Sequence, residues 1–331
     1  MHIERIDPHD LDLHTADAMA EVVRASDAAG GVPIPPVTGP TLLHAARHGW
    51  DGTPAGALWV LRDGDRVVGR VHADLPWRDN TDSFYYRGVV HPDVRRRGGG
   101  RALHDALLEV AAEAGRTKVY TGAFEGTDGI PALAALGYEP VGTNAIRRIS
   151  LHDAQPGLWD RLHAQASAKA GDYELVRMVG PTPAEQLEDM VALFATINDA
   201  PSEDADKEDD HWTADRVAAY DTAMAARRQT VYRVIARHRE TGEWAGHSVL
   251  CVDEFAPSTG FQEDTSVVRS HRGHGLGLLM KTDMLRWIGR ERPEVGATDT
   301  WNAVGNHHMI AVNELLGARV VARYVTHRLT R

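Results

Sequence analysis

The chain contains two copies of one glycine-rich pattern, and this repetition limits the folds that it can adopt. The first copy reads VVHPDVRRRGGGRALHDAL from Val89, and the second reads VVRSHRGHGLGLLMKTDML from Val267. In each copy an arginine is followed three and five positions later by glycine, and Arg272 follows Arg95 by 177 positions. Each pattern comes after a strand-like run and opens a helix-like run. Because such a turn exposes backbone N–H groups at the positive end of a helix dipole, the pattern predicts two sites for a phosphorylated ligand.

The repeat extends beyond the glycine turns. Each turn is followed by a second strand-like run and a short helix that ends in Leu-Gly, at Leu136-Gly137 and again at Leu316-Gly317. Landmarks that keep the same separation indicate two copies of one architecture. With 331 residues the chain can bury two cores. We therefore expect two domains, residues 1–152 and residues 172–331.

Composition and charge narrow the classes of partner. The sequence is 43% hydrophobic and carries a formal net charge of −11, which argues against a general nucleic-acid binder. No apolar run approaches the roughly 20 residues that span a bilayer, and the charged N-terminus lacks a signal peptide. The one cysteine, Cys251, lies in a buried-strand pattern and fits a reducing compartment. We expect a cytoplasmic protein that binds neither nucleic acid nor membranes.

Both halves place their elements in the same order. Helical segments come first, with Thr182 as a candidate cap before Pro183 and Thr213 as a second candidate. Hairpins follow, with turns at Asp63-Gly64 and at Glu240-Thr241-Gly242. Antiparallel strands that give way to strand, helix, strand and helix predict a mixed sheet with helices on both faces.

Three phosphate-binding patterns can be compared with these turns. A P-loop requires a lysine followed by a hydroxyl residue, which neither turn has. A dinucleotide fold requires G-x-G-x-x-G after the first strand of a βαβ unit, and here several antiparallel strands come first. The third pattern, R/Q-x-x-G-x-G/A after a strand, is the coenzyme A loop of the GNAT superfamily of N-acetyltransferases. Both turns resemble it, and the resemblance covers nearly the whole chain. It implies an α/β fold of two tandem GNAT domains, each a mixed, mostly antiparallel sheet flanked by helices.

The resemblance also implies which residues contact acetyl-CoA as the co-substrate. In the second half these are Val267, Val268, Arg272, Gly273, His274, Gly275, Leu276 and Gly277, with Asn302 and Asn306 further along. In the first half they are Val90, Arg95, Arg96, Arg97, Gly98, Gly99, Gly100 and Arg101. The alternative interpretation is that the glycines only permit tight turns and bind no ligand. Four arginines around one turn of an acidic protein repel one another unless an anion lies between them, which favours the phosphate interpretation.

Three asparagines distinguish the second half from the first. Asn302, Asn306 and Asn313 follow the second turn, and Asn306 and Asn313 share a helix face. The equivalent positions of the first half carry no polar side chain: Gly122, Gly126 and Leu133. In the family this region flanks the thioester, and many members carry a tyrosine acid where Asn313 stands. An alternative for Asn306 is a helix cap.

The expected reaction also requires a group that takes a proton from the attacking amine. Glu263 and Asp264 lie in the strand that lines the cleft in the family, and either can act as general base. Asp264 is the marginal choice, because strand alternation lets only one of them face the cleft and a bulge common there leaves the parity open. The resemblance places the acceptor pocket near the acidic stretch 201–212, which either attracts a cationic amine or is a solvated loop. Neighbouring His307 and His308 lack a third ligand, so we expect no metal.

The sequence thus predicts an acetyl-CoA-dependent N-acetyltransferase of a small-molecule amine, acting as a monomer or homodimer. The second half is the expected catalytic domain, and the first half is expected to be structural or to bind coenzyme A without turnover. One alternative is a non-catalytic acyl-CoA-binding or interaction protein. Another is a protein N-acetyltransferase.

Overall fold

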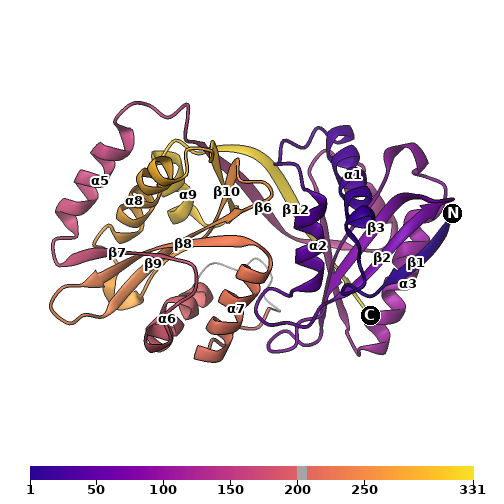
Figure 1. Ribbon diagram of the computed structural model, residues 1–331, viewed down its shortest axis with the longest axis horizontal. Coiled ribbons are helices and arrows are strands. Elements are labelled where there is room, and N and C mark those ends of the chain that lie inside the picture. Colours follow the sequence, from indigo (N-terminus) through magenta and orange to yellow (C-terminus); the bar gives the residue numbers. More distant parts are fainter. Residues whose placement is uncertain (200–206) are drawn as a thin grey trace. The chain divides into compact units, whose positions relative to one another are not determined.

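The computed structural model describes residues 1–199 and 207–331 (Figure 1). The strands are β1 (His2–Ile6), β2 (Ala57–Asp63), β3 (Arg66–Asp74), β4 (Ser83–Val90), β5 (Lys118–Phe124), β6 (Glu139–Ser150), β7 (Tyr173–Val179), β8 (Gln229–His238), β9 (Trp244–Asp253), β10 (Thr259–Val267), β11 (Ala297–Ala303) and β12 (Arg319–Thr330). The α-helices are α1 (Leu13–Ala29), α2 (Gly39–Arg47), α3 (Gly99–Glu113), α4 (Gly129–Ala135), α5 (Leu158–Lys169), α6 (Leu187–Phe194), α7 (Ala214–Ala226), α8 (Leu276–Glu291) and α9 (His307–Leu315). Short 3₁₀ helices are η1 (Pro92–Val94), η2 (Ala184–Gln186), η3 (Ala195–Asp199) and η4 (Arg269–His271).

The described residues form two compact units. The N-terminal unit contains residues 1–144, residues 207–208 and the end of the chain, 322–331. The C-terminal unit contains residues 145–199 and 209–321. The expected domains 1–152 and 172–331 remain a prediction, because they divide the chain by its internal repeat, whereas the compact units are defined by contacts.

In the N-terminal unit the strand order is β1-β2-β3-β4-β5-β12. Strands β4 and β5 are parallel, while β12 pairs antiparallel with β5. Alternate residues of β2 face two different cores. Leu58 and Val60 pack with residues of α1, whereas Trp59 and Leu61 pack with residues of α3. The sheet is therefore covered by α1 on one face and by α3 on the other.

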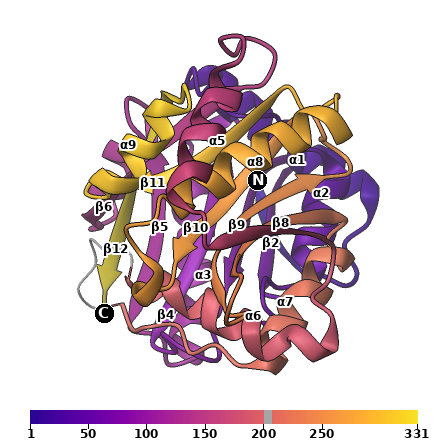
Figure 2. The same ribbon diagram turned by 90° about the vertical axis from the view of Figure 1, so that its left-hand side faces the viewer.

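In the C-terminal unit the strand order is β6-β11-β10-β9-β8-β7, and Figure 2 shows β11, β10, β9 and β8 side by side. Strands β10 and β11 are parallel, while β7, β8, β9 and β10 pair antiparallel in turn. This mostly antiparallel arrangement repeats that of the N-terminal unit.

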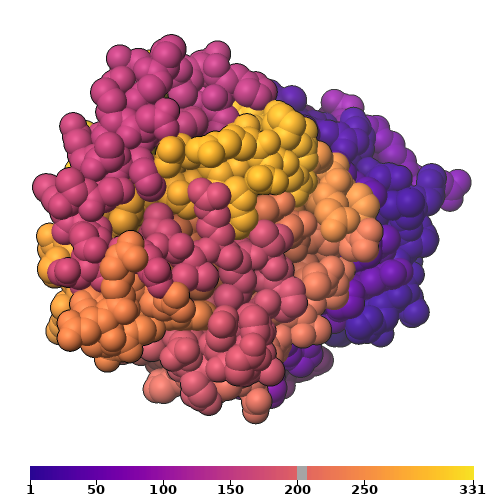
Figure 3. Space-filling model, turned by 60° about the vertical axis from the view of Figure 1, so that its left-hand side comes forward, coloured from indigo at the N-terminus to yellow at the C-terminus, as the bar shows by residue number. Residues whose placement is uncertain are grey.

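The two faces of this second sheet are also covered by different helices. Val249 and Cys251 of β9 pack with residues of α6 and α7, whereas Leu250 and Val252 pack with residues of α8. Figure 1 shows α6 and α7 on one side of β8 and β9, and α8 on the other. Helix α5 packs on α8, and Figure 3 shows its magenta segment on the outside of the C-terminal unit.

The structure confirms the predicted fold class and several local predictions. Gly64 and Gly242 have positive φ angles in the turns between β2 and β3 and between β8 and β9, as the hairpin signals require. Thr213 caps α7 by accepting a hydrogen bond from the Arg216 amide, and Cys251 is buried. The predicted cap at Thr182 is wrong. Helix α6 begins only at Leu187 after the short η2, and the Thr182 hydroxyl caps no helix.

Candidate active site

The two glycine turns are held by the same side-chain bond. Arg95 Nε donates to the Val90 carbonyl at 3.1 Å, and Arg272 Nε donates to the Val267 carbonyl at 3.1 Å. Each bond ties the turn back to the end of its central strand, β4 or β10. The first arginine of each pattern therefore shapes the turn, and its Nε is already occupied.

The backbone of each turn leaves donors at the start of a helix. Gly98 and Gly275 take the left-handed conformation, with φ of +87° and +74°, and neither helix start has a side-chain cap. The first intrahelical bonds run from Ala102 to Gly98 and from Leu279 to Gly275. The amides just before these donors have no intrahelical partner: those of Gly99, Gly100 and Arg101, and those of Leu276, Gly277 and Leu278.

This geometry fits a diphosphate at the second turn. A Cβ built on Gly277 would meet no atom of the described residues within 4 Å, so the space in front of these amides is open. Unpaired N–H groups at a helix N-terminus bind anionic oxygens. The predicted residues Gly275, Leu276 and Gly277 lie together at this helix start.

The C-terminal turn is partly neutralised by a carboxylate. Asp199, at the end of η3, accepts from Arg269 at 2.7 Å and from Arg272 at 2.5 Å. These bonds, that of Arg269 first, lower the pKa of Asp199. His274 is exposed, and its ring lies 5.4 Å from that of Tyr173. A phosphate at this turn would thus meet the main chain more than free guanidinium groups.

The N-terminal turn is more cationic. Arg96, Arg97 and Arg101 are exposed, and among the residues that the structure describes none of them lies within ion-pair distance of a carboxylate. Arg95 has polar partners besides Val90, since it donates to Ser26 Oγ at 2.8 Å and lies 3.4 Å from Asp128. This turn therefore keeps the positive charge that would attract a phosphate.

Both sheets open next to their glycine turns. Strand β10 pairs with β11 only from Thr259–Gln262 to Ala297–Thr300, and β4 pairs with β5 only from Ser83–Tyr85 to Lys118–Tyr120. Beyond these pairs the two parallel strands part. The opening lies at the carboxyl end of each central strand, where the turn begins.

The central strand of the C-terminal unit contains a bulge. Its register against β9 shifts between Gln262 and Thr265, so Glu263 and Asp264 both stand opposite Val249. A bulge re-aims side chains and is common beside active sites. The structure therefore explains why alternation alone could not decide which carboxylate faces inward.

The N-terminal unit has neither the bulge nor a carboxylate there. Strand β4 keeps regular register with β3, and Arg87 stands opposite His72. Arg87 lies three positions before the end of β4, as Asp264 does in β10, and its place opposite His72 corresponds to that of the bulged pair Glu263 and Asp264 opposite Val249. The candidate base of one unit is thus replaced by an exposed cation in the other.

Glu263 is held by a buried tyrosine. The Tyr220 hydroxyl donates to Glu263 Oε2 at 2.7 Å, and it also lies 3.9 Å from Cys251 Sγ. Burial raises the pKa of Glu263, and the Tyr220 bond partly opposes that rise. Asp264, at the next position, is half-buried. A carboxylate with a raised pKa and one fixed donor has the properties of a general base.

The asparagines form a pair and a cap. Asn313 Nδ2 donates to Asn302 Oδ1 at 2.8 Å, which joins α9 to β11, and both side chains are buried. Asn313 Oδ1 has no partner among the described residues. Asn306 Oδ1 accepts from the Met309 amide at 3.2 Å and caps α9. Asn306 Oδ1 is therefore a helix cap, which was the alternative interpretation of this residue.

Aromatic side chains fill the same region of the N-terminal unit. A Cβ on Gly122 would come within 2.4 Å of the Tyr324 ring, so that ring covers the strand. The rings of Tyr86 and Tyr138 pack edge to face with centroids 6.2 Å apart, and the Tyr138 hydroxyl lies 3.2 Å from His104 Nε2. These contacts occupy the space where the C-terminal unit has its asparagines.

Val268 and the acidic stretch 201–212 were both expected to lie at the site, and in the structure their described groups bond to other residues. The Val268 amide donates to the Ala245 carbonyl at 2.8 Å, so it is already used. Residues 200–206 lie outside the described residues, and they include part of the acidic stretch: Glu203, Asp204 and Asp206. Of the remainder, Glu208 accepts from the Asn80 amide at 2.8 Å, and Asp210 lies 3.9 Å from Arg216.

The part of the chain that the structure describes contains no cluster of three metal-ligating side chains. Within the same residues, no helix combines the length and apolar character needed to cross a bilayer.

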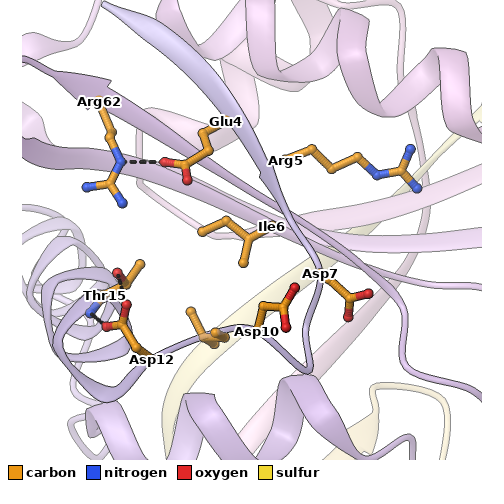
Figure 4. A pocket seen from close by; sticks show the side chains of 9 residues that line it. Glu4, Arg5, Ile6, Asp7, Asp10, Asp12, Thr15 and Arg62 are labelled. Carbon is orange, nitrogen blue, oxygen red and sulfur yellow. Dashed lines mark hydrogen bonds and ion pairs between the residues drawn. The ribbon is translucent and has the colours of Figure 1, made fainter.

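A cavity of about 250 Å³ lies in the N-terminal unit, and Figure 4 shows its lining. Three of its charged groups already have partners, since Arg62 Nε donates to Glu4 at 2.6 Å and Asp12 accepts from the Thr15 amide at 2.7 Å. None of the predicted site residues lines it. We therefore place the candidate site at the glycine turn and the bulge.

Sequence reasoning missed Tyr220 and Asp199. Tyr220 lies in the helix that Thr213 caps, and the sequence gives no sign that its hydroxyl has a partner 43 positions away. Asp199 follows α6 without any motif. The only signal in the sequence was charge, because two neighbouring arginines, Arg269 and Arg272, are stabilised by a carboxylate between them.

Comparisons with known proteins agree with this geometry. Residues 32–138 match the acetyltransferase (GNAT) family. Among curated proteins no sequence matches the chain significantly. The chain is similar in structure to a tandem GNAT protein from the clavulanic acid biosynthesis pathway, with 26% identity, coverage of 99% of this chain and 98% of that one, and a TM-score of 0.81.

Two further solved structures share the fold. A GCN5-related N-acetyltransferase from Sphaerobacter thermophilus has 16% identity over 99% of this chain and 95% of its own, with a TM-score of 0.65. A glucosamine N-acetyltransferase region of a fungal multi-domain GH3 β-N-acetylglucosaminidase has 16% identity over 99% of this chain and 38% of its own, with a TM-score of 0.66. Residues 32–138 therefore contain a GNAT acetyltransferase domain, and the chain shares the fold of a tandem GNAT protein, as expected from the two turns.

Proposed function

We propose that the protein is an acetyl-CoA-dependent N-acetyltransferase of a small-molecule amine and that the C-terminal unit carries out the transfer. The observation that carries this proposal is Glu263. Its side chain is half-buried at the β10 bulge, burial raises the pKa of its carboxyl group, and Tyr220 holds it by a hydrogen bond. The N-terminal unit has Arg87 at the equivalent place, so it lacks a base there.

The cofactor loop of the proposed reaction is the turn of residues 272–277. GNAT acetyltransferases use acetyl-CoA, which supplies an activated acetyl thioester when bound. The unpaired amides at the start of α8 would hold its diphosphate, and the open space at Gly277 leaves room for it. The hydrogen bond from Arg272 Nε to the Val267 carbonyl keeps these amides in place.

Glu263 is proposed to take the proton of the attacking amine. An aliphatic amine is almost fully protonated at neutral pH, so the reactive form must lose a proton first. A carboxylate whose pKa is raised toward neutrality accepts that proton more readily than an ordinary one. Holding the amine beside the thioester then supplies most of the acceleration. Asp264 stays the alternative base.

Asn313 is proposed to bind the cofactor rather than to act as an acid. Its Oδ1 is buried and has no partner among the described residues, so it can accept an N–H from a ligand. Asn302 fixes its orientation through the 2.8 Å bond. Leaving-group protonation would then fall to water, because a coenzyme A thiolate is a good leaving group.

The N-terminal unit is proposed to bind coenzyme A without turnover. Its exposed turn arginines, Arg96, Arg97 and Arg101, favour phosphate binding, and the family match covers this half. Arg87 stands where the C-terminal unit has its candidate base, which argues against acetyl transfer by the N-terminal unit. The 26% identical neighbour comes from a small-molecule biosynthetic pathway, which supports a small-molecule acceptor over a protein.

Thiol release from acetyl-CoA with a panel of small amines tests the proposal. We expect turnover with at least one amine and a loss of about 100-fold or more in kcat for Glu263→Gln, the range typical of a lost general base. The matched control is Glu254→Gln, an exposed glutamate of the same unit that pairs with Arg228. Saturable coenzyme A binding without any thiol release would indicate a non-catalytic binding protein instead.

A further inference from the structure

The N-terminal unit buries an arginine, Arg70, that makes no hydrogen bond or ion pair within the part of the chain that the structure describes. Arg70 is 9% exposed and lies on β3 between Val60 of β2 and Val89 of β4, both of which belong to the apolar core under α1. Its Nε makes no hydrogen bond, and no ion pair of its guanidinium occurs among the described residues. A buried charge in such a place normally pairs with an anion or is replaced by an apolar residue.

Arg70 remains charged despite its burial. Desolvation by burial, helped by the charge of Arg87, lowers the pKa of Arg70 to about 10, and Asp74 opposes this. At neutral pH the guanidinium is therefore still a cation. The apolar surroundings make this unpaired cation costly to the folded protein, so an unfilled ligand position explains it better than packing does.

A second cation faces the first. Arg87 of β4 stands opposite His72, and Arg70 stands opposite Val89, so the two arginines lie on the same face of neighbouring strands. Arg87 is exposed, which makes this pair reachable from solvent. The nearby carboxylate of Asp74 lies 4.0 Å from His72. Arg70 and Arg87 are therefore diagonal neighbours on one face of the sheet, and no carboxylate of the described residues is bonded to Arg70.

We propose that Arg70 and Arg87 form a binding site for the carboxylate of a small molecule in the N-terminal unit. The two arginines and Asp74 together carry one net positive charge, which a singly charged carboxylate balances and a doubly charged phosphate exceeds. The planar fork of a guanidinium matches a carboxylate with two parallel hydrogen bonds. The site takes a ligand opposite in charge to the amine proposed for the C-terminal unit, and it does not depend on that proposal.

Sodium butyrate, a monocarboxylate probe, tests the site on the full-length protein by titration calorimetry and thermal unfolding at constant ionic strength. We expect saturable binding that raises the unfolding temperature above that in equal sodium chloride. Arg87→Met, an exposed position that does not threaten folding, should weaken butyrate binding at least tenfold. Arg70→Met should abolish it while raising the unfolding temperature of the ligand-free protein, because an unpaired buried charge is removed.

Arg66→Met serves as the control, since Arg66 is an exposed arginine on the same strand and should leave butyrate binding unchanged. Inorganic phosphate provides the second arm. If phosphate binds and butyrate does not, the carboxylate assignment is wrong. If butyrate gives no saturable effect, or binds Arg87→Met and Arg70→Met as tightly as the wild type, the site itself is overturned.

Discussion

The hydroxyl of Tyr220 lies 2.7 Å from Oε2 of Glu263 and joins helix α7 to the bulge of the central strand β10. Tyr220 is fully buried and Glu263 is half-buried, and burial raises the pKa of each. The bond stabilises the ionised form of Glu263 relative to the protonated one. A single contact between a helix and a strand thus opposes part of the effect of burial on the proposed base.

Tyr220→Phe should shift the pH dependence of the reaction. The Tyr220 bond lowers the pKa of Glu263 against the effect of burial, so its removal raises that pKa further. Since the base acts when ionised, activity should begin at higher pH, and the acidic limb of kcat/KM against pH should move upward. Tyr232→Phe, which removes a hydroxyl bonded to Arg292 on the other face of the sheet, should leave the limb unmoved. An unchanged limb in Tyr220→Phe would remove Glu263 from the mechanism.

Arg233→Met should strongly destabilise the protein. Arg233 Nη2 lies 2.5 Å from Asp221 Oδ1, and both side chains are buried. Removing the cation leaves Asp221 buried and unpaired, which costs about 3–5 kcal/mol in the free energy of unfolding. Arg237→Met, which breaks an exposed pair with Glu174, should cost less than about 1 kcal/mol. Urea unfolding measures both variants, and similar losses would contradict the prediction.

Lys281→Met should remove a pH dependence of stability. Lys281 is 2% exposed, and burial lowers its pKa from 10.5 to about 7. Between these values the unfolded chain binds one proton more than the folded one, so the stability of the wild type should rise with pH, by at most about 1.4 kcal/mol per unit. Below the pKa that Lys281 has in the folded protein, the lysine is buried in its charged form and the full cost of that burial reduces the stability. The variant should lose this slope and be more stable near pH 7 in denaturant titrations. A slope that persists in the variant would show that other groups cause it.

Features with local causes could be predicted from the sequence. The hairpin glycines Gly64 and Gly242 and the Leu-Gly stops at Gly137 and Gly317 all require positive φ, which glycine adopts without strain. The Thr213 cap likewise needs only its next few residues. Two copies of such signals, kept in order, predict an internal repeat, and the resemblance of the two glycine turns to a coenzyme A loop predicts the family and the tandem fold.

Features that depend on contacts between residues far apart in the sequence could not be predicted from it. The pairing of β12 with β5 depends on contacts between the end of the chain and a strand some two hundred positions earlier. The β10 bulge shows in no residue preference, so the choice between Glu263 and Asp264 stayed open until the register was known. The bonds of Asp199 to Arg269 and Arg272 span 70 and 73 positions. The sequence showed the charges but not their pairing.

The division of labour between the units is tested most directly by placing a carboxylate in each glycine turn. Gly277 and Gly100 are equivalent positions with room for a side chain: no described atom lies within 4 Å of a Cβ on Gly277, and the nearest to Gly100 is 3.7 Å away. Neither has a positive φ, so both variants should fold.

The measurement is the initial rate of thiol release from acetyl-CoA with an accepted amine. Gly277→Glu should reduce kcat/KM by about 100-fold or more, about 2.7 kcal/mol in the barrier, because the new carboxylate repels the diphosphate. Gly100→Glu should keep most of the activity. Equal losses, or a greater loss in Gly100→Glu, would contradict catalysis by the C-terminal unit.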